Sequence, residues 1–345
     1  MNSKKILDIF EMYKVDAIIS ESPQTRYWYS EISTTDGWLI IEPKSATLFV
    51  DGRYIEYATK NAKNVSVQLL ANNSLQQWLK DKKFQKIAIE ADYLTVQNKI
   101  KIKDMLKIGD ESIIPINGQK LRIIKTEEEI LKIQKAIDIS LESFDKVQLF
   151  LKEGITEKEV QHKLEYIMVR SGAEKEAFDS IVAFGESTAE PHHHSSNKKL
   201  KKGDIVTIDF GAKFEGFCAD ITRTFIFEDQ KLNPKYNEIL EIVEEAARLG
   251  RQAVRPGIKA SEIDDICRSY ITSKGYSNFF LHSTGHGLGI DVHEFPYVSK
   301  LSDIVLEEGM VITVEPGIYI EGIGGARIED DLLVTSDGAK ILSRK

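Results

Sequence analysis

The stretch HSTGHGLGIDVHEFP, residues 282–296, brings three histidines, three glycines and two acidic residues into fifteen positions. Imidazole nitrogens bind metals and transfer protons near neutral pH. Glycine lets other chains and ligands approach the backbone closely. His286 stands between Gly285 and Gly287, and we predict it to be a metal ligand. Its partner ligands have to come from acidic residues elsewhere in the chain.

Residues 204–227, DIVTIDFGAKFEGFCADITRTFIF, contain two β-rich runs around a glycine-containing turn, the pattern of an antiparallel hairpin. Centring the turn between Phe214 and Glu215 places Asp209 directly opposite Asp220 on one face of the sheet. Like charges opposed in this way are destabilising, and a bound cation removes the repulsion. The alternative is that both carboxylates face solvent and are screened, but their apolar flanking residues favour the metal-binding interpretation.

A second pair of carboxylates comes from VITVEPGIYIEGIGGARIEDDLLV, residues 311–334. Centring its Gly-rich turn on Gly322 pairs Glu315 with Glu329. Four converging carboxylates carry more charge than one divalent ion neutralises, so two ions about 3.5–4 Å apart are expected. Oxygen ligands with one imidazole suit Mn²⁺, Co²⁺, Fe²⁺ or Zn²⁺. We predict two divalent ions, with Mn²⁺ preferred and Co²⁺, Zn²⁺ or Fe²⁺ as alternatives.

Six of the seven histidines fall between positions 192 and 293, alongside the acidic hairpins. Of the three that follow Pro191, we predict one functional residue, His192, with His193 and His194 as bystanders. The segment GHGLG lacks the spacing of a dinucleotide-binding loop, and no Walker-type lysine is present. A G-x-S-x-G nucleophile elbow is also missing. Phosphate binding and serine hydrolase chemistry are therefore disfavoured.

The composition is that of a soluble globular protein, with 42% hydrophobic and 29% charged residues and a net charge of −8. The sequence has no basic stripe, which argues against a nucleic-acid partner. No apolar run approaches the ~20 residues of a membrane span, so no membrane association is expected. Two cysteines cannot form a disulfide framework in a chain of this size, which predicts a cytoplasmic location.

At 345 residues the chain exceeds the roughly 100–200 residues of one domain. Alternating strands and helices predict an α/β domain over residues 1–120. The segment 115–125 contains a proline and an Asn-Gly turn and marks the predicted boundary. Helices mixed with antiparallel strands predict an α+β domain over residues 121–345. The expected helices are 3–13, 52–62, 73–82, 95–107, 126–150, 156–171, 234–253 and 260–274, and the strands expected in the first domain are 16–20, 38–41, 47–50, 65–70 and 86–90.

Five segments together resemble the pita-bread metallopeptidases, which include aminopeptidase P, prolidase and methionine aminopeptidase. They are VTIDFGA (206–212), DITRT (220–224), HSTGHGLG (282–289), VEPGIY (314–319) and RIED (327–330). Outside them, RYWYS (26–30) and LFVDGRY (48–54) are similar to the extra N-terminal domain of the Xaa-Pro branch. The resemblance implies a creatinase-type N-terminal α/β domain followed by a pita-bread catalytic domain.

The resemblance also implies how the metal ligands divide between two ions. Asp209 would chelate one ion, and Asp220 and Glu329 would bridge both. His286 and Glu315 would complete the second ion.

Four further roles follow from the same resemblance. His192 and His293 would contact the substrate and donate hydrogen bonds to the scissile carbonyl. Glu315 would act as the general base, and Arg327 and His282 would line the substrate pocket. The family often has Gly or an aromatic residue after the Pro-His pair, whereas this chain has two more histidines.

The implied activity is hydrolysis of an N-terminal Xaa-Pro bond, with peptides carrying proline at the second position as substrates and a homodimer as the assembly. A dipeptidase (prolidase) has to bind the free carboxylate of proline, ideally with arginine. The segment 294–311 has no arginine and only Lys300, which favours the aminopeptidase over the dipeptidase. A third alternative is a metal-free homologue, either creatinase-like or a binding module. Five metal-binding side chains argue against it.

Overall fold

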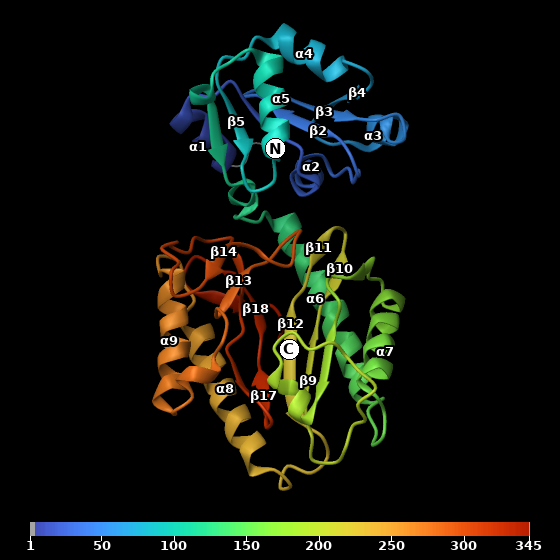
Figure 1. The fold of residues 1–345 in the computed structure, drawn as a ribbon, viewed down its shortest axis with the longest axis vertical. Helices are drawn as coiled ribbons and strands as arrows, with labels where there is room; N and C mark the ends of the chain where they lie inside the picture. The colour runs from blue at the N-terminus through green and yellow to red at the C-terminus, as the bar shows by residue number, and fades with distance from the viewer. Residues whose placement is uncertain (1–3, 345) are drawn as a thin grey trace. The chain divides into compact units, whose positions relative to one another are not determined.

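The computed structural model describes residues 4–344, so Ser3, the predicted start of the first helix, lies outside the described residues. The chain forms two compact units that divide between Arg122 and Ile123 (Figure 1). None of the helices within residues 4–344 has the length and apolar character needed to cross a membrane.

The N-terminal unit is built on a six-stranded mixed sheet in the order β4-β3-β2-β1-β5-β6. Its strands are β1 (Ala17–Ser20), β2 (Trp38–Ile41), β3 (Ala46–Val50), β4 (Ser66–Leu69), β5 (Ile87–Glu90) and β6 (Ile113–Ile116). Its helices are α1 (Lys4–Tyr13), α2 (Pro23–Ser30), α3 (Ile55–Asn61), α4 (Ser74–Lys82) and α5 (Val96–Leu106). Most of these elements were predicted to within three residues.

Two elements of this unit were not predicted. Helix α2 contains aromatic residues that suit strands better, yet Ser22 caps it by accepting a hydrogen bond from Thr25 N, and Pro23 occupies its first turn. Strand β6 contains Pro115 and lies at the edge of the sheet, where a missing N–H is tolerated. The predicted boundary segment therefore begins inside a strand.

The second unit has four long helices and four small sheets. The helices are α6 (Glu127–Gln148), α7 (Glu157–Arg170), α8 (Pro234–Ala253) and α9 (Ala260–Ser273). The first strands are β7 (Lys175–Glu176), β8 (Ile181–Phe184), β9 (Ile205–Phe210), β10 (Ala212–Phe214), β11 (Phe217–Cys218) and β12 (Ile221–Ile226). The later strands are β13 (Gly285–Gly287), β14 (Glu294–Val298), β15 (Val311–Val314), β16 (Gly317–Ile320), β17 (Gly324–Arg327), β18 (Asp330–Val334) and β19 (Ala339–Ile341).

The strands of this unit lie between two pairs of helices, with α6 and α7 beside β8–β10 and α8 and α9 beside β14 and β17 (Figure 1). Helix α6 begins with the predicted capping box, in which Thr126 and Glu129 satisfy each other's backbone N–H groups. Apolar side chains of α8 and α9, such as Val243 and Ile263, pack with Val314 in one core. The predicted fold class is confirmed.

The register predicted for the first acidic hairpin is wrong by two residues. Phe214 pairs with Phe217, so the turn consists of Glu215 and Gly216. Both turn residues have positive φ, at 43° and 76°, as a type I′ turn requires. Moving the centre of the turn by one residue shifts each pairing by two. Asp209 therefore lies opposite Thr222, and the partner that the register assigns to Asp220 is Gly211.

The second acidic hairpin has the predicted register on both sides of its carboxylates. Val314 pairs with Asp330, and Gly317 pairs with Arg327. Glu315 and Glu329 occupy the gap between these two ladders, at opposite positions. Their backbone N–H groups instead donate to Thr284 O at 2.7 Å and Thr222 O at 3.1 Å. This outward bonding joins the hairpin to the neighbouring segments that carry the other candidate ligands.

Candidate active site

A pocket of about 440 Å³ in the second unit is lined by every residue predicted for the site. These residues are His192, Asp209, Asp220, His282, His286, His293, Glu315, Arg327 and Glu329. They come from strand ends and loops spread over more than 130 positions of sequence, and the folding of the two acidic hairpins brings them together.

The candidate ligands form three overlapping groups in which one atom per residue lies within 4.8 Å of the others. The groups are Asp209–Asp220–Glu329, His286–Glu315–Glu329 and Asp220–His286–His293. Asp220, His286 and Glu329 each belong to two groups, and of these only the two carboxylates have a second oxygen with which they could bridge neighbouring ions. Although Asp209 and Asp220 are not directly opposite, they share one face of the hairpin and converge on this point.

The buried carboxylates of this cluster fit divalent ions. Burial raises the pKa of Asp209, raises that of Asp220 to about 7 and raises that of Glu329 well above its ordinary value. Asp209 Oδ1 and Glu329 Oε1 are buried and accept no hydrogen bond from any residue among 4–344. Leaving a buried carboxylate oxygen unpaired is costly, and a coordinated cation would remove that cost.

His286 presents one ring nitrogen to the carboxylates. Its Nε2 lies 3.4 Å from Asp220 Oδ2 and 3.3 Å from Glu315 Oε1, while Nδ1 lies 3.0 Å from Gly287 O. A proton on Nδ1, donated to that carbonyl, leaves Nε2 as the ligand atom. Burial lowers the pKa of His286, but the hydrogen bonds and charges of the two carboxylates outweigh it and raise that pKa well above 6.5. His286 in turn overcomes the effect of burial on Glu315 and lowers the pKa of that carboxyl to about 2.

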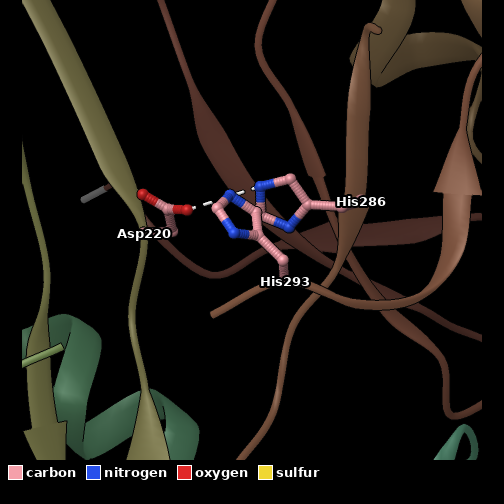
Figure 2. A group of neighbouring side chains, drawn as sticks. All are labelled: Asp220, His286 and His293. Carbon is pink, nitrogen blue, oxygen red and sulfur yellow. Dashed lines mark ion pairs between the residues drawn. The ribbon is translucent and has the colours of Figure 1, made fainter. Parts of the chain in front are cut away.

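The ring of His293 lies next to that of His286, with centroids 4.3 Å apart and an angle of 76° between the planes (Figure 2). Its position in a group with Asp220 also makes it a candidate ligand, which the sequence did not suggest. His293 is an exposed residue of the pocket, but partial burial of its ring and the neighbouring His286 lower its pKa. Its neutral ring can donate one hydrogen bond.

The guanidinium of Arg327 is occupied by groups of the protein itself. Its NH2 contacts Asp209 Oδ2 at 2.7 Å, and its Nε donates to Thr222 Oγ1 at 2.9 Å. Its NH1 donates to the hydroxyl of Tyr319 at 2.8 Å, and that hydroxyl also lies 2.8 Å from His282 Nε2. Arg327 therefore fixes the pocket wall, including one candidate ligand and the ring of His282.

Sequence reasoning assigned no role to Thr222 or Tyr319. Thr222 Oγ1 donates to Glu329 Oε2 at 2.7 Å and joins Arg327 to the carboxylate cluster. Its sequence signal is its spacing, because a residue two positions after Asp220 on a strand shares its face. For Tyr319 no local signal exists, since its partners lie 8 and 37 positions away.

The three consecutive histidines differ in their surroundings. His192 lines the pocket. His193 was predicted to be a bystander, and its ring nitrogens each lie 2.9 Å from a carboxylate, those of Glu190 and Glu157. His194 is exposed.

The fold and the site together are those of a pita-bread metallohydrolase. The chain belongs to metallopeptidase family M24, whose model matches residues 131–336. Residues 3–124 match the creatinase/prolidase N-terminal domain.

Several known proteins are similar over nearly the whole chain. A Xaa-Pro dipeptidase of Pyrococcus furiosus is 39% identical over 345 residues, which cover 99% of this chain and 97% of that protein. The structure of a Xaa-Pro dipeptidase from Bacillus anthracis superposes with a TM-score of 0.92 at 38% identity, covering 99% and 96% of the two chains. An X-Pro aminopeptidase from Thermotoga maritima gives a TM-score of 0.87 at 34% identity, covering 96% of each.

Proposed function

We propose that this protein is a dinuclear, Mn²⁺-dependent Xaa-Pro aminopeptidase that removes the first residue from peptides with proline at the second position. Family membership and the buried carboxylate cluster support metal-dependent peptide hydrolysis. The names of the similar proteins support the Xaa-Pro bond as the target.

Asp209, Asp220, His286, Glu315 and Glu329 would hold the two ions. Once bound, the ions would polarise the scissile carbonyl and lower the pKa of water enough for attack near neutral pH. Glu315 would act as the general base and take up the proton that the attacking water loses.

His293 and His192 would donate hydrogen bonds to the carbonyl oxygen as it gains negative charge. A donor of this kind typically contributes about 2.7–4 kcal/mol to the transition state. His282 is held by Tyr319 OH at Nε2 and by Ser283 O at Nδ1, and burial lowers its pKa, so it forms a fixed neutral wall. Arg327 would support this wall and Asp209 instead of binding the substrate directly.

One observation carries the preference for an aminopeptidase. Arg327 is the sole arginine or lysine among the described residues that line the pocket, and all three of its nitrogens are engaged by protein groups. The residue after Phe295–Pro296 is the neutral Tyr297, which also lines the pocket. A free proline carboxylate would therefore meet no available guanidinium or ammonium group there, whereas a longer peptide has no charge at that point.

A Xaa-Pro dipeptidase is the second candidate, because two of the similar proteins carry that name at 38–39% identity. The test offers Ala-Pro and Ala-Pro-Ala-Ala to the Mn²⁺-loaded protein and identifies the products by mass spectrometry. We expect alanine to be released from the tetrapeptide. Cleavage of the dipeptide alone would make the protein a prolidase, and cleavage of neither by metal-loaded protein would refute the Xaa-Pro assignment.

A further inference from the structure

The side chain of His193 is held between two carboxylates. Its Nε2 lies 2.9 Å from Glu157 Oε2, and its Nδ1 lies 2.9 Å from Glu190 Oε2. A carboxylate can only accept hydrogen bonds, so both contacts are satisfied only when both ring nitrogens carry protons. A neutral ring would turn one lone pair toward a carboxylate. The geometry therefore requires the imidazolium form.

Glu157 is a buried anchor for the loop that contains His193. Its side chain is fully buried at the start of α7, where the helix N-terminus favours a negative charge. Its Oε1 accepts from Phe184 N of β8 at 2.9 Å. Its Oε2 accepts from the N–H and hydroxyl of Ser196 at 2.9 and 2.7 Å, besides His193. The carboxylate thus joins a helix, a strand and both ends of the segment 193–196.

The same loop is held on the other side of His192. Pro191 O accepts a hydrogen bond from Arg327 NH1 at 3.3 Å. The residue before His192 is therefore held by Arg327, and the residue after it by Glu157. Because His192 itself is exposed and lines the pocket, its ring position depends on these two attachments.

We propose that His193 is a positioning residue that holds His192 in the substrate pocket in its imidazolium form, so that deprotonation of His193 sets an upper pH limit on activity. The inference rests on the proposed function, because it is there that His192 acts on the substrate. It gives a role to the position at which this chain departs from the Gly or aromatic residue often found in the family.

The two charged groups that face His193 are both carboxylates and both favour its imidazolium form. Glu157 from α7 and Glu190 from the same loop face it, while Lys198 directs its ammonium to Glu186 at 3.3 Å and to Ser187. Strand β8 faces the loop with backbone groups, and Val182 N donates to Ser195 Oγ.

The pH range of the contact follows from the two pKa shifts. Burial lowers the pKa of His193, but the hydrogen bonds to Glu190 and Glu157 outweigh it and raise the pKa above 6.5. Its stabilising contribution is fully present below 6.5 and is lost as pH rises through the raised pKa. For Glu157, burial opposes ionisation, but its hydrogen bonds from His193 and Ser196 lower the pKa below 4.5. That contribution is present above 4.5 and is lost as pH falls through the lowered pKa.

The test compares His193→Gln, Glu190→Gln and the exposed-neighbour control His194→Gln in the full-length protein. Glutamine at 193 can donate to only one carboxylate, so we expect kcat to fall about 10–100-fold with a smaller change in KM. Glutamine at 190 offers an amide N–H to a neutral His193 ring. We expect it to shift the alkaline fall in kcat/KM to higher pH while activity at neutral pH is kept. Metal content should remain at the wild-type value in all three.

Two measurements keep this inference separate from the proposed function. An NMR titration of the His193 ring reads its pKa directly, and hydrogen exchange of residues 190–196 reads the order of the loop. A pKa of 6.5 or lower, or equal kinetics and loop exchange in His193→Gln and His194→Gln, would overturn the inference. If the wild-type protein cleaves no Xaa-Pro peptide, the proposed function fails, whereas a raised pKa and faster loop exchange in His193→Gln would still support the positioning contact.

Discussion

Replacing Asp264 with alanine should destabilise the catalytic unit, because this buried carboxylate ties α9 to the segment beside the candidate ligands. Its oxygens accept from Arg268 Nε and NH2 at 2.8 and 2.9 Å. They also accept from Thr284 N and Oγ1 at 3.1 and 2.9 Å. Thr284 O in turn accepts from Glu315 N at 2.7 Å. The substitution therefore removes the link between the helix and a predicted metal ligand.

The expected cost can be built from these contacts. Removing one partner of a buried ion pair costs about 3–5 kcal/mol. The Arg268 side chain keeps 27% of its exposure and can regain water, so the lower end of about 3 kcal/mol applies. The unpaired N–H of buried Thr284 adds about 1 kcal/mol. The total is about 4 kcal/mol, or roughly a 1,000-fold change in the unfolding equilibrium. Asp264→Asn keeps an acceptor for Thr284 but not the charge that pairs with Arg268, so about 3 kcal/mol of this cost is expected.

Hydrogen exchange measured on peptides of α9 checks this value, since the slowest amides report the free energy of opening of the unit. All three tryptophans precede position 80, so tryptophan fluorescence follows the N-terminal unit during denaturation and provides an internal reference. The matched control is Asp265→Ala, an exposed neighbour for which a change within about 0.5 kcal/mol is expected. Wild-type exchange in Asp264→Ala, or an equal effect of both substitutions, would refute the reasoning.

Three further outcomes can be measured directly. Gly285→Ala places a Cβ 2.1 Å from the backbone carbonyl of Thr313; strand displacement should lower Tm and metal affinity together, and an unchanged Tm would contradict it. His293→Ala should lower kcat about 10²–10³-fold with metal content retained, whereas loss of metal by elemental analysis would make His293 a ligand with Asp220. Metal binding to metal-free protein near pH 6 should release protons, because burial raises the pKa values of Asp220 and Glu329; calorimetry in buffers of different ionisation enthalpy would show no buffer dependence if both were already ionised.

Much of the fold was predictable because its local signals agree with each other. Thr126 and Glu129 mark the start of α6 through short-range chemistry, and the alternation of strands and helices predicted most of the elements of the N-terminal unit. Helix α2 was not predicted. Its aromatic residues favour a strand, but Ser22 caps the helix and Pro23 occupies its first turn. The capping interaction outweighs the strand propensity of the aromatic residues in this segment.

The sequence predicted which residues line the candidate pocket, but not which residues contact one another around it. The register of the first hairpin depends on which two residues form the turn. Because the turn lies one residue further along the chain than predicted, the residue opposite Asp209 is Thr222 instead of Asp220. Asp209 and Asp220 still converge, because a register shift of two residues leaves each side chain on the same face of the sheet. By contrast, the contact between His193 and Glu157 joins residues 36 positions apart, and no spacing within the sequence indicates it.

The way the site is assembled explains why three of its four carboxylates, those of Asp209, Asp220 and Glu329, stand in surroundings that disfavour their charge. Asp209, Asp220, Glu315 and Glu329 come from two separate hairpins, and the unfolded chain keeps them apart. Only the folded chain gathers their charges in a buried place, where Asp209 Oδ1 and Glu329 Oε1 accept no hydrogen bond from the described residues 4–344. The fold itself must therefore supply the free energy that holds these carboxylates together, through cores such as the one shared by α8, α9 and β15. Divalent ions that bind this arrangement and not the unfolded chain would return part of that free energy as stability.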